Sequence, residues 1–353
     1  MAQDILLVGS IPFDTPEQVL TMCGQKLGDS AAYFPDGETY ERIWWVNMLA
    51  YRVFHGHPEI DTVMRPPPDH GVEKWRPSDR GELWQFAVKP GVKEVKFGDP
   101  GWRLNYTKDA VGSYFVFKTL RKEGKLPADA KFQVCIPLTN SAIDVFFHNP
   151  ADYDVIKPGF EEAIRTEIAK MCELIPPSDL AIQWDCCIEL MDLEGNFPWT
   201  PKENKLERNV APVERLSPYI PKEVKLGYHL CYGTLGGWPM VKTAKDLSTA
   251  VEWANAAVAR SGRHVDFVHI PVLDRTDDPY YAPLKNLKIG DARLYLGLVH
   301  GPRPAISDRI RAAKKVVKDF GIGAYCGLGR HRPDQVAGIL DDHVAALETL
   351  HGH

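Results

Sequence analysis

The stretch "KLGYHLCYG" (residues 225–233) decides the fold, together with the two segments that follow it. It is an apolar run with the length and composition of a buried β-strand. A helical pattern, "TAKDLSTAVEWANAAVARSG" (243–262), comes next, and a second strand-like run, "VDFVHIPV" (265–272), comes after it. A strand, a helix and a strand in succession predict two parallel strands joined by a crossover helix.

The same unit recurs along the chain. Six further strand-like runs lie at residues 5–10, 31–38, 132–138, 180–185, 293–301 and 322–329, and further helical patterns lie at residues 15–27, 158–175, 305–321 and 332–350. Eight apolar strands that alternate with helices predict an α/β fold, a closed (β/α)8 TIM barrel. The chain of 353 residues is long enough to form this barrel as a single domain over residues 1–353.

Two stretches exceed what a minimal barrel needs, and they follow the second and fourth predicted strands. Residues 56–130 are rich in proline, glycine and tryptophan, with a hairpin predicted around "KPGVKE" (89–94), and residues 191–224 are polar and contain several prolines. Because both follow a strand, they would lie on the catalytic face of a barrel. We expect residues 56–130 to form an insertion or lid; the alternative is that both stretches only decorate the surface.

The charge and cysteine content exclude several classes of protein. The chain has 47 acidic and 42 basic residues and no basic tract, so nucleic acid is not an expected partner. No apolar stretch reaches the roughly 20 residues of a membrane helix, and the N-terminus lacks a signal-peptide pattern, so we expect a cytoplasmic protein with no membrane partner. Seven cysteines, an odd number, argue against a disulfide framework.

Polar and metal-binding side chains gather where the predicted strands end, which is where barrels of this kind carry active sites. His229 and Cys231 are two positions apart in one strand, so they face the same side, and Cys326 follows the last strand. One imidazole and two thiolates suit a catalytic zinc ion, which keeps a fourth position open. Taken alone, His229 would more often be a buried core residue, and only a closed barrel could bring Cys326 to it.

Six short motifs resemble those of one enzyme family, in order along nearly the whole chain. "LLVGSIP" is similar to the family's "IGSFP", "DGETYER" to "GEPER", "IQWD" to "IQIDEP", "YHLCYG" to "HMCYS", "LVHGP" to "DIHSP", and "AYCGLGRHRPDQV" to "PDCGLKTR". The family is the catalytic barrel of cobalamin-independent methionine synthase and, more broadly, the uroporphyrinogen decarboxylase superfamily with its zinc-dependent methyltransferases. The histidine and cysteine pair with the late "CGLG" is the most specific part of the resemblance.

The resemblance implies roles for particular residues. It makes His229, Cys231 and Cys326 zinc ligands, gives Glu38 and Asp185 the carboxylates that hold the amino acid part of the substrate, and makes His300 the general acid for a folate leaving group. Methionine synthase takes a fourth ligand, a glutamate, from its sixth strand, where this chain has Pro271. We expect His269, two residues earlier on the same face, to replace it; the alternative is a buried structural histidine.

These departures make methionine synthesis itself doubtful, so we expect a related zinc-dependent methyl- or alkyltransferase with a thiol or a folate as the acceptor. Ser10 and Arg42 at strand ends, and Trp184 as part of a pocket wall, are assigned to binding a cofactor such as tetrahydrofolate or a small aromatic substrate. One alternative is a lyase, a hydrolase or a decarboxylase that uses the same pocket. Another is a structural zinc ion in a barrel that only binds a ligand.

Overall fold

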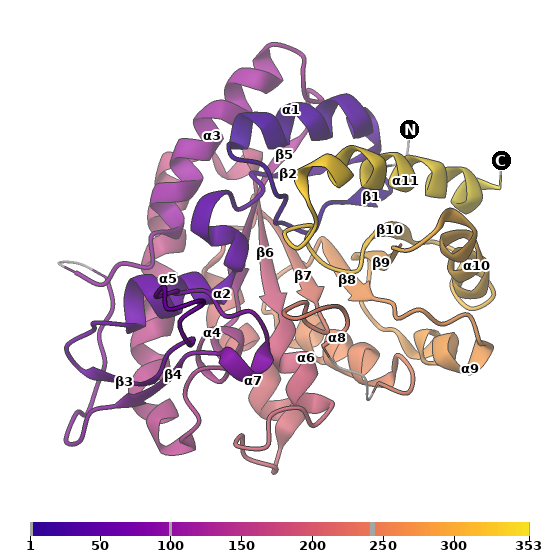
Figure 1. Cartoon of the computed structure of the whole chain (residues 1–353). Coiled ribbons are helices and arrows are strands. Elements are labelled where there is room, and N and C mark those ends of the chain that lie inside the picture. The colour runs from indigo at the N-terminus through magenta and orange to yellow at the C-terminus, as the bar shows by residue number, and fades with distance from the viewer. Residues whose placement is uncertain (1–2, 99–100, 241–243, 353) are drawn as a thin grey trace.

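The computed structural model describes residues 3–98, 101–240 and 244–352, and its central feature is an eight-stranded parallel sheet curved into a nearly closed barrel (Figure 1). The strands pair in the order β1-β10-β9-β8-β7-β6-β5-β2. They are β1 (Ile5–Leu6), β2 (Tyr33–Pro35), β5 (Lys131–Pro137), β6 (Leu180–Cys186), β7 (Lys225–Leu230), β8 (Phe267–Pro271), β9 (Arg293–Val299) and β10 (Gly321–Ala324). A parallel bridge between Ile5 and Ala31 brings the two ends of the sheet together, so the predicted barrel is confirmed.

Long helices surround the barrel. They are α1 (Pro16–Leu27), α3 (Tyr106–Lys122), α5 (Tyr153–Leu174), α7 (Lys205–Leu216), α8 (Ser248–Arg260), α10 (Arg303–Lys314) and α11 (Pro333–His351). The sequence sets the start of α1, because the Thr15 side chain accepts from the Gln18 backbone N–H while the Gln18 side chain caps the Thr15 backbone. The last helix, α11, packs against both α10 and α1 and so completes the ring.

The strands carry polar side chains toward the centre of the barrel. All of β6 is buried, and Gln183 points inward, where its Nε2 donates to Asp185 Oδ1 at 2.8 Å. Gln133 on β5 donates to Gln183 Oε1 at 3.1 Å. These bonds satisfy polar groups that burial would otherwise leave unpaired, and they orient Asp185 at the C-terminal end of its strand.

The segment after β2 forms a small layer of its own. Strands β3 (Ile60–Met64) and β4 (Gln85–Val88) pair antiparallel, so the predicted hairpin around residues 89–94 is wrong: that segment follows β4 instead of joining two strands. Helix α3, also within residues 56–130, packs against α1 and α5 in the outer ring. Among the described residues of this stretch, those before α3 therefore stand outside the barrel.

Within residues 191–224, the segment Lys205–Leu216 forms α7, which lies in the ring next to α8. Pro212 lies inside that helix, and an internal proline is a signal that usually ends a helical pattern. Four short helices lie at α2 (Val46–Leu49), α4 (Thr139–Ile143), α6 (Cys187–Leu193) and α9 (Asp278–Tyr281). The segments that α2, α4 and α6 belong to come directly after barrel strands, so they carry side chains to the C-terminal face.

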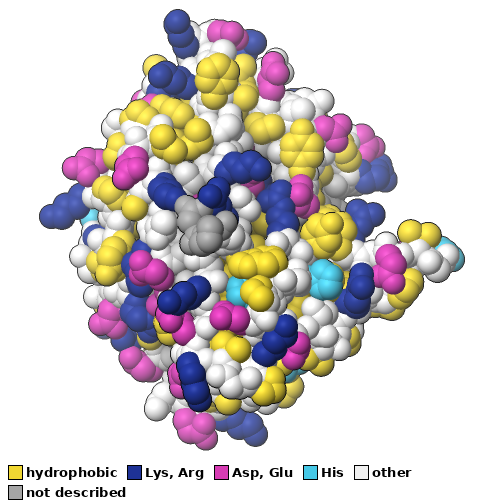
Figure 2. Space-filling view, turned by 90° about the vertical axis from the view of Figure 1, so that its left-hand side faces the viewer, with side chains coloured by type: hydrophobic (Ala, Val, Ile, Leu, Met, Phe, Trp, Pro, Cys, Tyr) yellow, Lys and Arg dark blue, Asp and Glu magenta, His cyan; other side chains and the backbone are white. Residues whose placement is uncertain are grey.

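The surface carries mixed charge. Figure 2 shows one face of the molecule, on which lysines and arginines are interspersed with aspartates, glutamates and apolar side chains. Within the described ranges, no helix is both long enough and apolar enough to cross a membrane.

Candidate metal centre

A row of three polar side chains crosses the barrel near the C-terminal ends of its strands. The register pairs Asp185 on β6 with His229 on β7, and His229 with His269 on β8. Paired residues in neighbouring parallel strands point to the same face of the sheet, so all three side chains share one layer of the interior. All three are buried, and His269 is fully inaccessible to solvent.

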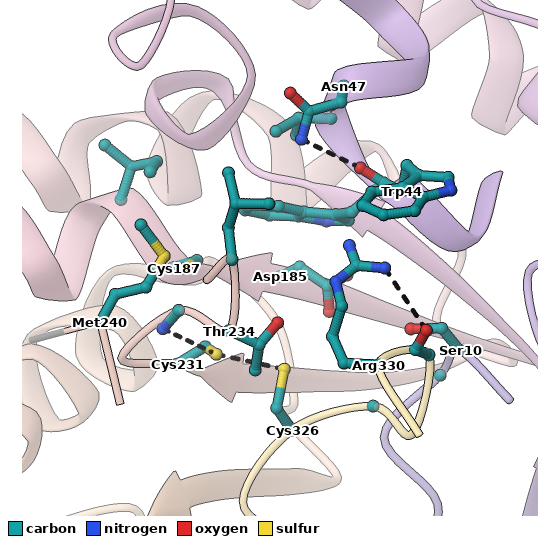
Figure 3. Close-up of a pocket in the computed structure, with 18 of the residues that line it drawn as sticks. Ser10, Trp44, Asn47, Asp185, Cys187, Cys231, Thr234, Met240, Cys326 and Arg330 are labelled. Carbon is teal, nitrogen blue, oxygen red and sulfur yellow. Dashed lines mark hydrogen bonds between the residues drawn. The ribbon is translucent and has the colours of Figure 1, made fainter. Parts of the chain in front are cut away.

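Three donor atoms converge next to this row. Cys231 follows β7 and Cys326 follows β10, and their Sγ atoms lie 3.2 Å apart. The possible ligand atoms of His229, Cys231 and Cys326 all lie within 4.8 Å of one another. Figure 3 shows the two sulfurs meeting from separate strands, with the Gly233 N–H donating to Cys231 Sγ at 3.2 Å. Barrel closure has therefore brought the distant Cys326 to the local pair.

The donor set fits a zinc ion. Nitrogen from one histidine and sulfur from two cysteines are ligands that zinc prefers. His229 Nδ1 lies 2.8 Å from His269 Nδ1, which leaves Nε2 of His229 for a metal. Burial, with the neighbouring His269, holds the pKa of His229 well below its usual value, so the ring is in the neutral form that can bind metal.

The thiols also need a cation to become ligands. Hydrogen bonds between neighbouring thiols, together with burial, raise the pKa of Cys231 and of Cys326 well above the usual thiol value. A coordinating cation deprotonates a thiol outright, which removes this penalty. The adjacent sulfurs of Cys231, which is buried, and Cys326, which is partly buried, are thus suited to hold a metal.

His269, the predicted fourth ligand, lies beside His229 and outside the group of converging donor atoms. Its ring lies beside that of His229, with centroids 4.8 Å apart, and it is not in the group of converging donor atoms. The in-register pairing of β7 with β8 places the two rings side by side, so the nitrogen of His269 meets His229 instead of the sulfurs. His269 is therefore placed to fix the orientation and tautomer of His229.

Cys187 is a further sulfur at this site, and the sequence analysis missed it. It is the first residue of α6, it lines the cavity together with Cys231, and the two thiols are close enough to shift each other's pKa. Its neighbour Cys186 is fully buried and interacts with the Trp184 carbonyl instead. A usable signal was present, because Cys187 stands two positions after Asp185 and so shares its side of the chain if the strand continues.

A cavity with an empty volume of about 890 Å³, partly open to solvent, lies over the three donor atoms. Most of its wall is apolar, formed by Ile43, Trp44, Trp45, Ile188, Met191, Phe197, Leu235 and Met240. Arg330 enters this wall with its guanidinium 4.2 Å from the centre of the Trp44 ring and donates to the Ile43 carbonyl at 3.1 Å. Arg80, from the segment between β3 and β4, also lines the cavity, so that segment covers the site.

Two carboxyl groups lie in the same cavity. Burial raises the pKa of Glu38 to about 7, with Arg42 and Ser10 opposing the rise. Burial also raises the pKa of Asp185 well above its usual value, and the nearby charge of Glu38 adds to the rise. Glu38 is therefore partly protonated near neutral pH, which lets it act as a proton donor as well as an acceptor.

The three residues predicted to bind a cofactor lie in three different places. Ser10 lines the cavity next to Glu38. Arg42 forms an ion pair with Asp36 at 2.7 Å and lines a smaller pocket behind Glu38. Trp184 alternates with the inward residues of β6, so it faces away from the cavity and packs in the core.

His300 does not reach the cavity. Its Nε2 lies 2.9 Å from the Val272 carbonyl oxygen, and its ring packs edge-on against Trp238, with centroids 4.8 Å apart. Burial lowers the pKa of His300 to about 4, so the ring is neutral near pH 7. This placement does not give His300 access to a leaving group in the cavity.

Comparisons with known proteins rest on structure alone, since no family model and no curated protein matches the chain. A B12-independent methionine synthase from Shewanella sp. W3-18-1, in complex with selenomethionine, aligns with a TM-score of 0.59 and 15% identity over 95% of this chain and 86% of that chain. A putative vitamin-B12 independent methionine synthase from Listeria monocytogenes gives 0.52 and 14% over 94% and 85%. A methyltransferase from Methanosarcina mazei gives 0.50 and 11% over 96% and 86%. Over nearly its whole length, the chain therefore has the barrel fold of methionine synthase-like and methyltransferase structures.

Proposed function

We propose that the protein is a zinc-dependent methyl- or alkyltransferase whose acceptor is a substrate thiol or a folate. The observation that carries this proposal is the convergence of His229, Cys231 and Cys326 at the floor of a largely apolar cavity. A metal with three protein ligands and access to a cavity is the arrangement of a catalytic zinc site, whereas structural zinc sites use four protein ligands. The similarly folded structures are a methionine synthase, a putative methionine synthase and a methyltransferase, which supports the same class of reaction.

The protein would hold zinc through His229 Nε2, Cys231 Sγ and Cys326 Sγ. When bound there, zinc would supply a Lewis acid that lowers the pKa of a substrate thiol, so that its sulfur can attack an alkyl carbon near neutral pH. His269 keeps His229 in place through the contact between the two Nδ1 atoms. The apolar wall excludes water that would otherwise compete as a nucleophile.

The carboxyl pair would bind the substrate and move the proton. Glu38, with its pKa raised to about 7, holds a proton near neutral pH and can donate it from a carboxyl oxygen to the leaving group as the carbon is transferred. Asp185 is oriented by the Gln183 amide at 2.8 Å and can accept an N–H of the substrate. This gives the general acid role, which the resemblance assigned to His300, to a residue that lines the cavity.

Several residues separate this protein from methionine synthase itself. Pro271 stands where a glutamate would complete the zinc site, and a proline side chain cannot bind metal. Leu298, fully buried, stands two residues before His300 where the related motif has an aspartate. The zinc ligands and the surroundings of the acid that would protonate the leaving group are both changed. We therefore propose that the methyl or alkyl donor and acceptor differ from those of methionine synthesis.

Isotope-labelled transfer tests the proposal. Zinc-loaded protein is incubated with a panel of methyl-labelled donors, including a methylated folate and methyl ethers, and with homocysteine, coenzyme M, glutathione or tetrahydrofolate as acceptors. Mass spectrometry should detect a labelled thioether or methylfolate that requires zinc and is lost in Cys326→Ser but kept in Cys172→Ser, which alters a cysteine of α5. Substrate loss that is independent of any acceptor would overturn the transferase and favour a lyase or hydrolase.

A further inference from the structure

We propose that Cys187 is the fourth protein ligand of the metal when no substrate is bound, which gives a site of one nitrogen and three sulfurs. This inference rests on the zinc site of the proposed function. It adds the ligand that fills the fourth coordination position of the metal before substrate binds. It assigns a role to a thiol that neither the sequence analysis nor the transfer mechanism above uses.

The three sulfurs line one cavity. Cys231 Sγ lies 3.2 Å from Cys326 Sγ, and the Cys187 thiol is close enough to Cys231 for each to shift the pKa of the other. Cys187 lines the same cavity as His229 and is itself almost completely buried. Figure 3 labels Cys187 near Met240 and Cys231 among the residues that line the cavity.

The backbone at Cys187 is held by hydrogen bonds that do not involve its thiol. Ser141 Oγ accepts from the backbone N–H of Cys187 at 3.0 Å and from that of Ile188 at 3.1 Å. Ser141 is fixed in turn by Glu189, to which it donates both its hydroxyl and its backbone N–H. These bonds anchor the first turn of α6 without engaging the Cys187 thiol.

A change of rotamer brings Cys187 to the metal. In the described parts of the chain, its sulfur is outside the group of donor atoms that lie within 4.8 Å of one another. Rotation about χ1 between staggered positions moves a cysteine sulfur by ~3 Å, which would carry the Cys187 sulfur toward the position that the three donors leave open. His269 lies outside that group of donor atoms, with its Nδ1 against His229, and the Pro271 side chain has no donor.

The exchange with a substrate thiol balances without an outside acid or base. A substrate thiol would release its proton as its sulfur bonds to the metal. The Cys187 sulfur would leave the metal at the same step and take up that proton, becoming a thiol again. The charge of the site is unchanged, so an apolar cavity can accommodate the exchange. Cys187 then remains beside the substrate as a buried neutral thiol.

Counting sulfur ligands tests the inference with a readout other than activity. Zinc-loaded whole protein without thiol reductant is measured by X-ray absorption at the zinc edge, and cobalt-loaded protein is measured by its thiolate charge-transfer absorption. We expect three sulfurs per zinc in the wild type and two in Cys187→Ser and Cys187→Ala, with charge-transfer intensity lower by about a third. Cys186→Ser is the matched control, because its sulfur is buried and turned away, and should keep three.

The outcomes separate this inference from the zinc site itself. One zinc per chain with only two sulfurs in the wild type, or an unchanged count in both Cys187 variants, overturns the role of Cys187 and leaves the site of three ligands intact. A folded wild-type protein that binds no zinc overturns both. A fourth ligand that is oxygen, as Asp185 would provide, also contradicts the inference.

Discussion

Replacing His269 by leucine removes the residue that the structure places directly behind a metal ligand. In the wild type, His229 Nδ1 has His269 Nδ1 as its partner at 2.8 Å, which fixes the tautomer in which Nε2 is free for the metal. Leucine fills a similar volume but cannot hydrogen-bond. His269→Leu therefore leaves His229 Nδ1 buried without a partner and lets the imidazole rotate.

The expected effect has two parts. Loss of a residue that orients a metal-bound histidine lowers metal affinity by roughly 10- to 100-fold, which corresponds to about 1.4–2.7 kcal/mol. Leaving a buried ring nitrogen unpaired lowers the free energy of unfolding by about 1–3 kcal/mol. Because His269 both orients His229 and pairs with it inside the barrel, the loss of zinc affinity and the loss of stability should appear in the same variant.

Zinc affinity is measured by competition with a chromophoric chelator, and stability by urea unfolding of the metal-free protein. The control is His57→Leu, which alters another buried histidine, one whose Nε2 pairs with the Lys96 carbonyl oxygen at 3.0 Å in the insertion. This control should lose stability and keep its zinc affinity. If folded His269→Leu binds zinc within threefold of the wild type, His269 does not position His229 and the reasoning is refuted.

Three further variants test neighbouring parts of the account. Burial raises the pKa of Glu38 from 4.5 to about 7, so the folded state favours the protonated acid and stability falls as pH rises through this window. Urea unfolding at several pH values should show a flatter decline in Glu38→Gln; an identical profile would contradict the shift. Ser141→Ala removes the acceptor for two N–H groups of α6 and should cost about 1–2 kcal/mol in urea unfolding; no loss would refute this. Trp184→Phe should lose about 1–3 kcal/mol of stability with unchanged zinc affinity by chelator competition, and weaker zinc binding would contradict its placement in the core.

The barrel was predictable because its strands are buried on both faces. Each of the eight strands is a short apolar run, and such runs are visible in the sequence without knowledge of their partners. The pairing of β3 with β4 was not predictable from turn residues, since the Pro90–Gly91 turn signal lies after both strands. Strand β4 is held instead by contacts with distant segments: the Phe86 N–H donates to the Phe146 carbonyl at 2.9 Å, and Phe86 packs edge-on against Phe54.

The site was predictable only where local geometry determines it. The spacing of two residues placed Cys231 on the side of His229, and the barrel prediction allowed Cys326 to join them. The ring of His269 lies on the predicted face, but whether its nitrogen meets a metal or another histidine depends on the register between β7 and β8. Cys187 was missed because its orientation depends on the turn into α6.

The metal content of the purified protein tests the central claim most directly. Plasma mass spectrometry of folded wild-type protein should give about one zinc per chain. Cys231→Ser and Cys326→Ser should lose that zinc on dialysis against a weak chelator, while Cys172→Ser, altered on α5, should retain it. A folded wild-type protein that binds no zinc, or serine variants that keep it with unchanged affinity, would contradict the account.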